Sequence, residues 1–304
     1  MNLEWSFMIN IKDLYRWCSI PPNELVNHPE RRVPFRIVPD AVALGEAMAE
    51  DFAGDIENAN REGRKYNAIV PCGPKEWYAP FARIVNGRRI SLKNVTTFHM
   101  DENLDWDCNL LHEEDPSNFG TFMRRYFYDT IDPELAVIPD NRNFLLPDNF
   151  KELAMRIAET DIDYTLGGWG QDGHLAYNQA RRSPYLHVTI DDVKNSTAHI
   201  RENNTDTILA LSQRSFGSAW QFIPPMCVTL GPRECLKAKK IRVYSATGAW
   251  KQTALRVALF SGPAAEYPMT LLQEHKDALI TATAETAGHP FAENPQWRFG
   301  GINA

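Results

Sequence analysis

Apolar residues recur at helical spacing in several segments of the chain. Leu44, Met48, Phe52 and Ile56 are four residues apart, which predicts a helix with a single apolar stripe. Similar patterns predict further helices over residues 11–20, 75–85, 119–127, 150–158 and 250–259.

Short apolar runs lie between these helices. They cover residues 68–70, 95–99, 164–166, 241–245 and 278–282. Runs of this length, bounded by turn residues, are typical of buried strands. Strands that alternate with helices form βαβ units, so we expect an α/β fold with a mostly parallel sheet covered by helices on both faces.

The two ends of the chain do not follow this pattern. Four prolines between residues 21 and 34 interrupt any long helix, so residues 1–34 are expected to form an N-terminal extension. Regular alternation covers residues 35–286, which we expect to be one domain. Residues 287–304 contain two more prolines and are expected to be an irregular tail.

Composition and charge exclude several classes of protein. The 304 residues are 43% hydrophobic and 23% charged, as in ordinary globular proteins, and the net charge of −7 argues against nucleic-acid binding. No apolar run approaches the roughly 18 residues of a membrane span. The five cysteines form no C-x-x-C pair, and no secretory signal is visible, so we expect a cytoplasmic protein without disulfides or zinc.

Ligands of parallel sheets bind outside the carboxyl ends of the strands. This rule selects the loops after Val70, His99 and Leu166. The loop after Leu166 is rich in glycine and contains the pattern G-x-G-x-x-G, with Gly168 and Gly170 as its first two members. One interpretation is a dinucleotide site with Asp191 as its acidic residue, and another is a simple glycine turn.

A third interpretation is that this loop places Asp172 and His174 in a cleft. A carboxylate two residues from a histidine can orient the imidazole and raise its basicity. The strand before the cleft ends in His99-Met100-Asp101-Glu102. Since side chains alternate along an extended chain, only one of the two acids can point into the cleft. The alternative is a solvated acidic loop.

Two turns between a strand and a helix could hold a phosphate group. The first is the loop at residues 72–75, because helix N-termini present free N–H groups to anions. The second contains Lys251, which could meet a phosphate as a point charge. Each turn taken alone also fits an ordinary surface loop.

Taken together, these loops resemble the glucosamine-6-phosphate deaminase/isomerase family, whose superfamily includes the 6-phosphogluconolactonases. The matching pieces are VTTFHMDE at 95–102, GGWGQDGHLAYN at 167–178 and GAWK at 248–251. The resemblance covers about four-fifths of the chain. It implies a Rossmann-like fold of the kind found in ribose-5-phosphate isomerase and the CoA transferases, with no cofactor and no metal.

The resemblance also implies roles for individual residues. Asp101 matches the base that moves a proton between C2 and C1 of the sugar, and Asp172 and His174 match the unit that opens the ring. The implied substrate contacts are Cys72, Gly73, Lys75, Glu102, Gly168, Gly170, Arg201 and Lys251. The expected partner is a small sugar phosphate, and since the family often forms oligomers a homo-oligomer is possible.

The chain departs from the family pattern at two places. Gln179, counted here with the catalytic set, stands where the deaminases carry an acid, and the loop at 72–75 lacks the family's hydroxyl side chains. A glutamine can form hydrogen bonds but cannot relay a proton. Both departures favour a diverged deaminase or isomerase acting on an amino-hexose or hexose 6-phosphate. The alternatives are a lactonase of the 6-phosphogluconolactonase type and a non-catalytic sugar-phosphate sensor.

Overall fold

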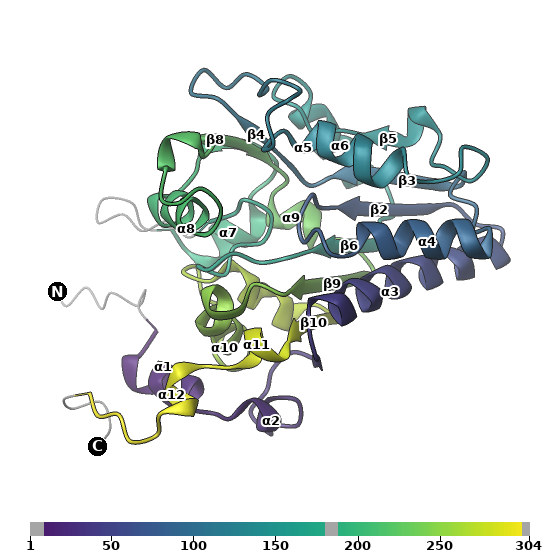
Figure 1. Cartoon of the computed structure of the whole chain (residues 1–304). Helices are drawn as coiled ribbons and strands as arrows, with labels where there is room; N and C mark the ends of the chain where they lie inside the picture. The colour runs from purple at the N-terminus through teal and green to yellow at the C-terminus, as the bar shows by residue number, and fades with distance from the viewer. Residues whose placement is uncertain (1–8, 180–187, 300–304) are drawn as a thin grey trace.

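A seven-stranded parallel sheet forms the centre of the protein. The computed structural model describes residues 9–179 and 188–299. The strands follow the order β1-β10-β9-β6-β2-β3-β5, and every pair of neighbours is parallel (Figure 1). Their bounds are β1 Phe35–Val38, β2 Tyr66–Val70, β3 Val95–His99, β5 Arg142–Asn143, β6 Tyr164–Gly167, β9 Lys240–Ser245 and β10 Ala278–Thr283.

Helices cover both faces of this sheet. The longer ones are α3 Ala41–Arg61, α4 Tyr78–Arg88, α6 Phe150–Glu159, α8 Thr205–Ser215 and α10 Gln252–Phe260. Shorter ones are α1 Ile11–Cys18, α2 Pro22–Leu25, α5 Phe119–Met123, α7 Ile190–Asn195, α9 Pro232–Cys235, α11 Ala284–Ala287 and α12 Pro290–Glu293. The expectation of a three-layer α/β fold with a mostly parallel sheet is confirmed.

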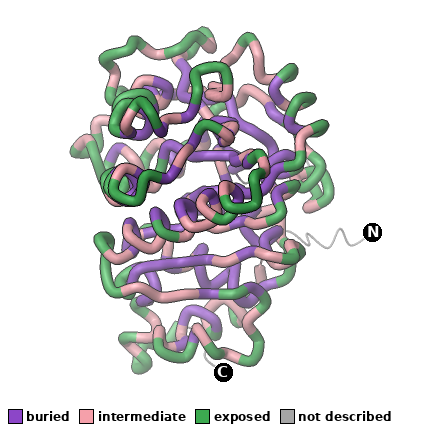
Figure 2. The backbone as a smooth tube through the Cα atoms, turned by 90° about the vertical axis from the view of Figure 1, so that its right-hand side faces the viewer, coloured by how far each residue is buried: buried purple, intermediate pink, exposed green. Residues whose placement is uncertain are grey.

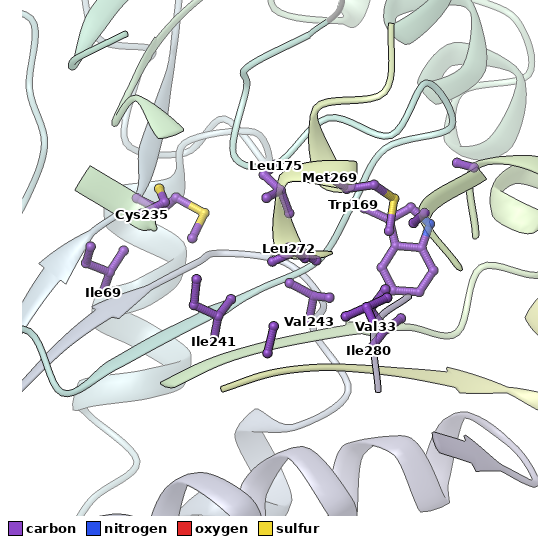
Figure 3. Packing of buried hydrophobic residues seen from close by; sticks show 14 of the residues in the cluster. Val33, Ile69, Trp169, Leu175, Cys235, Ile241, Val243, Met269, Leu272 and Ile280 are labelled. Carbon is purple, nitrogen blue, oxygen red and sulfur yellow. The ribbon is translucent and has the colours of Figure 1, made fainter. Parts of the chain in front are cut away.

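The side chains of the central strands β2, β3 and β9 divide between two hydrophobic cores. On β2, Ala68 and Val70 pack in the core under α3 and α4, whereas Ile69 points to the opposite core. Figure 3 shows this second core, where Ile69, Ile241 and Val243 meet side chains from the loops above. A parallel sheet covered on both faces needs apolar residues on both, which explains the continuous apolar runs in the sequence.

A second, smaller sheet lies beside the first and was not predicted. Its strands are β4 Asp101–Leu104, β7 His199–Glu202 and β8 Met226–Thr229, paired antiparallel in the order β4-β8-β7. Only Met100 separates the end of β3 from the start of β4, so the chain passes from one sheet to the other within a single residue.

The two ends of the described chain pack together against α10. Tyr15 of α1 contacts Phe291 of α12, with 5.3 Å between the ring centroids, and Figure 1 shows the two helices side by side. Trp17 and Leu25 belong to the same hydrophobic core as Ile69. Buried and exposed segments alternate along the backbone (Figure 2). The proposed boundaries of the extension and the tail remain predictions.

Candidate active site

A cavity of about 450 Å³ opens at the carboxyl ends of the central strands. Pro71 follows β2, Asp101 follows β3, Gly168 follows β6 and Ala246 follows β9, and all four line the cavity. The cavity therefore lies at the edge of the sheet that the strand-end rule selects.

Asp101 and Glu102 point in opposite directions, as strand alternation predicts. Asp101 lines the cavity, whereas Glu102 is buried on the other side of β4. There its carboxylate accepts hydrogen bonds from the backbone N–H groups of Phe119 (2.8 Å) and Gly120 (2.6 Å), which fixes the start of α5. Glu102 thus supports the wall of the cavity from behind, since Phe119 lines it.

The environment of Asp101 makes its carboxyl group a weak acid. Burial raises its pKa to about 7, and the neighbouring carboxylate of Glu102 adds to the rise. A group with this pKa takes up and releases a proton with similar ease near neutral pH.

Asp172 and His174 form a hydrogen-bonded pair. The distance between Asp172 Oδ1 and His174 Nδ1 is 2.6 Å, and Asp172 is 2% exposed. Burial acts to raise the pKa of Asp172, but its interactions with His174 and with backbone N–H groups outweigh burial and hold that pKa below its ordinary value. A carboxylate on Nδ1 favours the tautomer with the proton there, which leaves the Nε2 lone pair of His174 for a ligand in the cavity.

Three glycines of this loop have close neighbours that leave little room for a side chain, and at Gly170 the neighbour is His174. A Cβ atom at Gly170 would overlap the imidazole ring, and one at Gly168 would lie 3.3 Å from Pro74. Gly173 has a φ of +71°, and a Cβ there would lie 2.9 Å from Tyr267. The loop then enters a turn at Leu175–Asn178 rather than a helix. The pattern therefore lacks the helix of a dinucleotide site and instead makes room for the histidine.

Among the described residues, three cationic side chains line the same cavity: Lys75, Lys251 and Arg214. Burial, together with the positive charge of Arg214, lowers the pKa of Lys251 to about 8. Lys251 thus lies close enough to Arg214 to feel its positive charge, and such a pair makes a suitable site for an anion. The Nζ atom of Lys75 also lies 4.1 Å from the ring centroid of Phe122.

Arg214 was missed in the sequence. It lies on α8 with Thr207 and Leu211, and all three line the cavity. Their spacing of four and three residues is that of one helix face, which is the signal that could have identified them.

Five of the sequence candidates lie outside the cavity lining: Cys72, Glu102, Asp172, Gln179 and Arg201. Cys72 is buried below its loop, and burial raises the pKa of its thiol, while Gly73 of that loop does line the cavity. Glu102 supports α5 as described above. The guanidinium of Arg201 donates to the backbone oxygen of Gln179 (3.1 Å). Gln179 itself is buried, and within the described residues no hydrogen bond joins it to His174.

Within residues 9–179 and 188–299, which the structure describes, no helix is long and apolar enough to cross a bilayer. In the same ranges, no group of three histidine, cysteine or acidic side chains is arranged to hold a metal ion.

Comparison of the amino-acid sequence with known proteins identifies relatives of this chain. Glucosamine-6-phosphate deaminase from Porphyromonas gingivalis is 31% identical over 80% of this chain and 89% of its own length. The enzyme of the same name from Phocaeicola vulgatus is 29% identical over 79% of this chain and 88% of its own. No family model matches the chain.

Solved structures share the fold. A monomeric glucosamine-6-phosphate deaminase superposes with a TM-score of 0.69 at 21% identity, covering 83% of this chain and 98% of that one. A 6-phosphogluconolactonase from Shewanella baltica superposes with a TM-score of 0.56 at 17% identity, covering 82% and 97%. The fold is thus the one common to these deaminases and lactonases. Within that class, the chain belongs to the glucosamine-6-phosphate deaminase family.

Proposed function

We propose that this protein opens the ring of a hexose or 2-aminohexose 6-phosphate and moves a proton between C2 and C1. The observation that carries the proposal is the meeting of Asp101, whose pKa lies near 7, with the Asp172–His174 pair and three cations at one cavity. The names of the curated relatives support the same class of substrate.

Each group has a step that suits its chemistry. His174 Nε2 accepts the proton of the O1 hydroxyl and returns a proton to the ring oxygen, which opens the ring to the aldehyde. Asp101 then removes the C2 proton and delivers it to C1, while His174 carries a proton from the amino or hydroxyl group at C2 to O1. With an amino group at C2 this leaves an imine, which water hydrolyses to a ketone and ammonia. With a hydroxyl at C2 the product is the ketose.

Lys251 and Arg214 bind the phosphate in this scheme. Their contacts are made away from the reacting carbons, so they supply binding energy that holds C1 and C2 against Asp101 and His174. The depressed pKa of Lys251 would rise again beside a phosphate dianion.

Proton NMR in D2O with a panel of hexose and 2-aminohexose 6-phosphates tests the proposal. We expect the C2 proton signal of at least one sugar to disappear, with ammonia release if the sugar carries an amine. Asp101→Asn should slow this exchange by about a thousandfold while the dissociation constant changes less than about threefold. Asp107→Asn, an exposed acid in the following loop, is the matched control. Exchange at the wild-type rate in Asp101→Asn would refute the role of Asp101.

Lactone hydrolysis is the second candidate, because His174 paired with Asp172 is also suited to activate water. This reaction does not require Asp101 as a base. Hydrolysis of 6-phosphogluconolactone that survives Asp101→Asn, with no C2 exchange in any sugar of the panel, would favour the lactonase.

A further inference from the structure

Two glutamine side chains converge on one threonine at the wall of the cavity. Gln171 Nε2 donates to Thr207 Oγ1 at 3.0 Å, and Gln179 Nε2 donates to the same oxygen at 2.8 Å. Thr207 is 2% exposed, and both Thr207 and Gln171 line the cavity.

The orientation of the Gln179 amide is set by a third group. The backbone N–H of Asn204 donates to Gln179 Oε1 at 2.6 Å, so the amide nitrogen must face Thr207. Gln179 therefore joins the loop of His174 to the first turn of α8. This is the position at which the family carries an acid.

These two hydrogen bonds leave only the hydroxyl hydrogen of Thr207 to be paired. A threonine hydroxyl has two lone pairs and one hydrogen. The two amides occupy both lone pairs. Within the described residues the hydroxyl hydrogen has no acceptor. A buried donor without a partner is costly, and a ligand in the cavity can supply the acceptor.

We propose that Thr207 donates a hydrogen bond to a hydroxyl oxygen of the sugar, at O3 or O4, and so determines which sugar is accepted. This inference rests on the proposed sugar-phosphate function. Thr207 lies seven residues before Arg214 on the same face of α8, about 10 Å along the helix axis. If Arg214 holds the phosphate, Thr207 faces the carbon chain between the phosphate and the reacting carbons.

Gln179 is a positioning residue in this arrangement. A carboxylate at this place has no N–H to offer, so Thr207 would have to donate its hydrogen to it and would lose the donor that faces the ligand. The glutamine thus fixes the direction of the Thr207 hydroxyl.

Calorimetric binding of the preferred sugar phosphate and of its 3-deoxy and 4-deoxy analogues tests the inference. Thr207→Val should weaken binding of the parent sugar by about tenfold, and one analogue should bind the wild type and Thr207→Val equally. Thr207→Ser, which keeps the hydroxyl, should stay within about twofold of the wild type. Thr205→Val, an exposed threonine on the same helix, is the matched control.

A displaced helix would affect all three ligands alike. An equal loss for the parent and both analogues would therefore overturn the inference, as would a Thr207→Val protein that binds the parent as tightly as wild type. Neither result would affect the proposed function. A wild type that binds no sugar phosphate of the panel would overturn both.

Gln179→Glu gives a second, independent readout. If the substitution reverses the hydrogen bond at Thr207, the difference in affinity between the parent and the sensitive analogue should vanish. If Gln179→Glu still binds the parent sugar and the sensitive analogue with the same difference in affinity as the wild type, the role of Gln179 is contradicted. A general electrostatic effect of the new charge would shift the parent and the analogues together and leave their ratio intact.

Discussion

The cavity is built from two regions that hold their side chains in different ways. Asp101 lies just after β3 of the central sheet, and Asp172 and His174 lie in the loop after β6, where they are hydrogen-bonded to each other. Thr207 and Arg214 come from α8, a helix next to the small sheet, and Arg214 is exposed. The proposed reacting groups beside the central sheet and the proposed binding groups on α8 should respond differently to substitution: the first through kcat, the second through KM.

The largest effect is expected at Gly170, in the loop after β6, because the His174 ring packs directly against this glycine. Gly170→Ala forces the His174 ring to move, because the added methyl group overlaps it. A misplaced base costs about a hundredfold in rate, so kcat should fall by at least that factor with a smaller change in KM. Steady-state kinetics and a melting curve measure this.

Gly54→Ala is the control for this substitution, because a Cβ there meets nothing within 4 Å. It should leave kcat unchanged. If Gly170→Ala turned over at the wild-type rate, the claim that this glycine exists to accommodate His174 would have to be abandoned.

On the α8 side the expected effect is smaller and falls on KM. Arg214→Met removes a cation from the cavity, and losing one charged hydrogen bond to phosphate should raise KM about thirtyfold with kcat within about threefold. Arg125→Met, an exposed arginine outside the cavity lining, should change neither constant. A fall in kcat alone in Arg214→Met would mean that the helix takes part in catalysis and would end the distinction between the two regions.

The pH profile should show one proposed reacting group and one proposed phosphate-binding group, both of which follow strands of the central sheet. Asp101 must be ionised to accept a proton, so kcat/KM should fall about tenfold per unit below pH 7. Lys251 must be protonated to bind phosphate, so kcat/KM should fall again above about pH 8. Lys251→Met should remove the alkaline limb and leave the acid limb in place. An alkaline limb that persists in this variant would have to come from another group.

The sequence revealed the central sheet better than the region around α8, for a physical reason. Strands buried on both faces need continuous apolar runs, so Val95–His99 was predicted with its observed bounds. Strand β4 reads Asp-Glu-Asn-Leu and is buried through hydrogen bonds of Glu102 and Asn103, which leave no apolar pattern. Its partners β7 and β8 are equally short, so the small sheet was not seen.

The same contrast holds for the candidate residues. Asp101, Asp172 and His174 follow strands closely, so their place could be inferred from the strands. The alternation rule also separated Asp101 from Glu102 before any coordinates were considered. Arg214 depends on which face α8 turns toward the cavity, and Gln179 on partners 25 and 28 residues further along the chain. The local sequence pattern therefore predicts neither the orientation of Arg214 nor the hydrogen-bond partners of Gln179.

The passage from β3 to β4 through Met100 limits how the proposed base can move. The Met100 N–H donates to Val70 (3.0 Å) and its carbonyl accepts from Leu230 (2.8 Å), so the backbone beside Asp101 is tied to both sheets. Freedom is left only in the torsions of the Asp101 side chain. Adjacent carbons of a sugar are about 1.5 Å apart, a typical C–C bond length. Rotation about two side-chain bonds spans that distance, so the proton could travel from C2 to C1 while the main chain stays still.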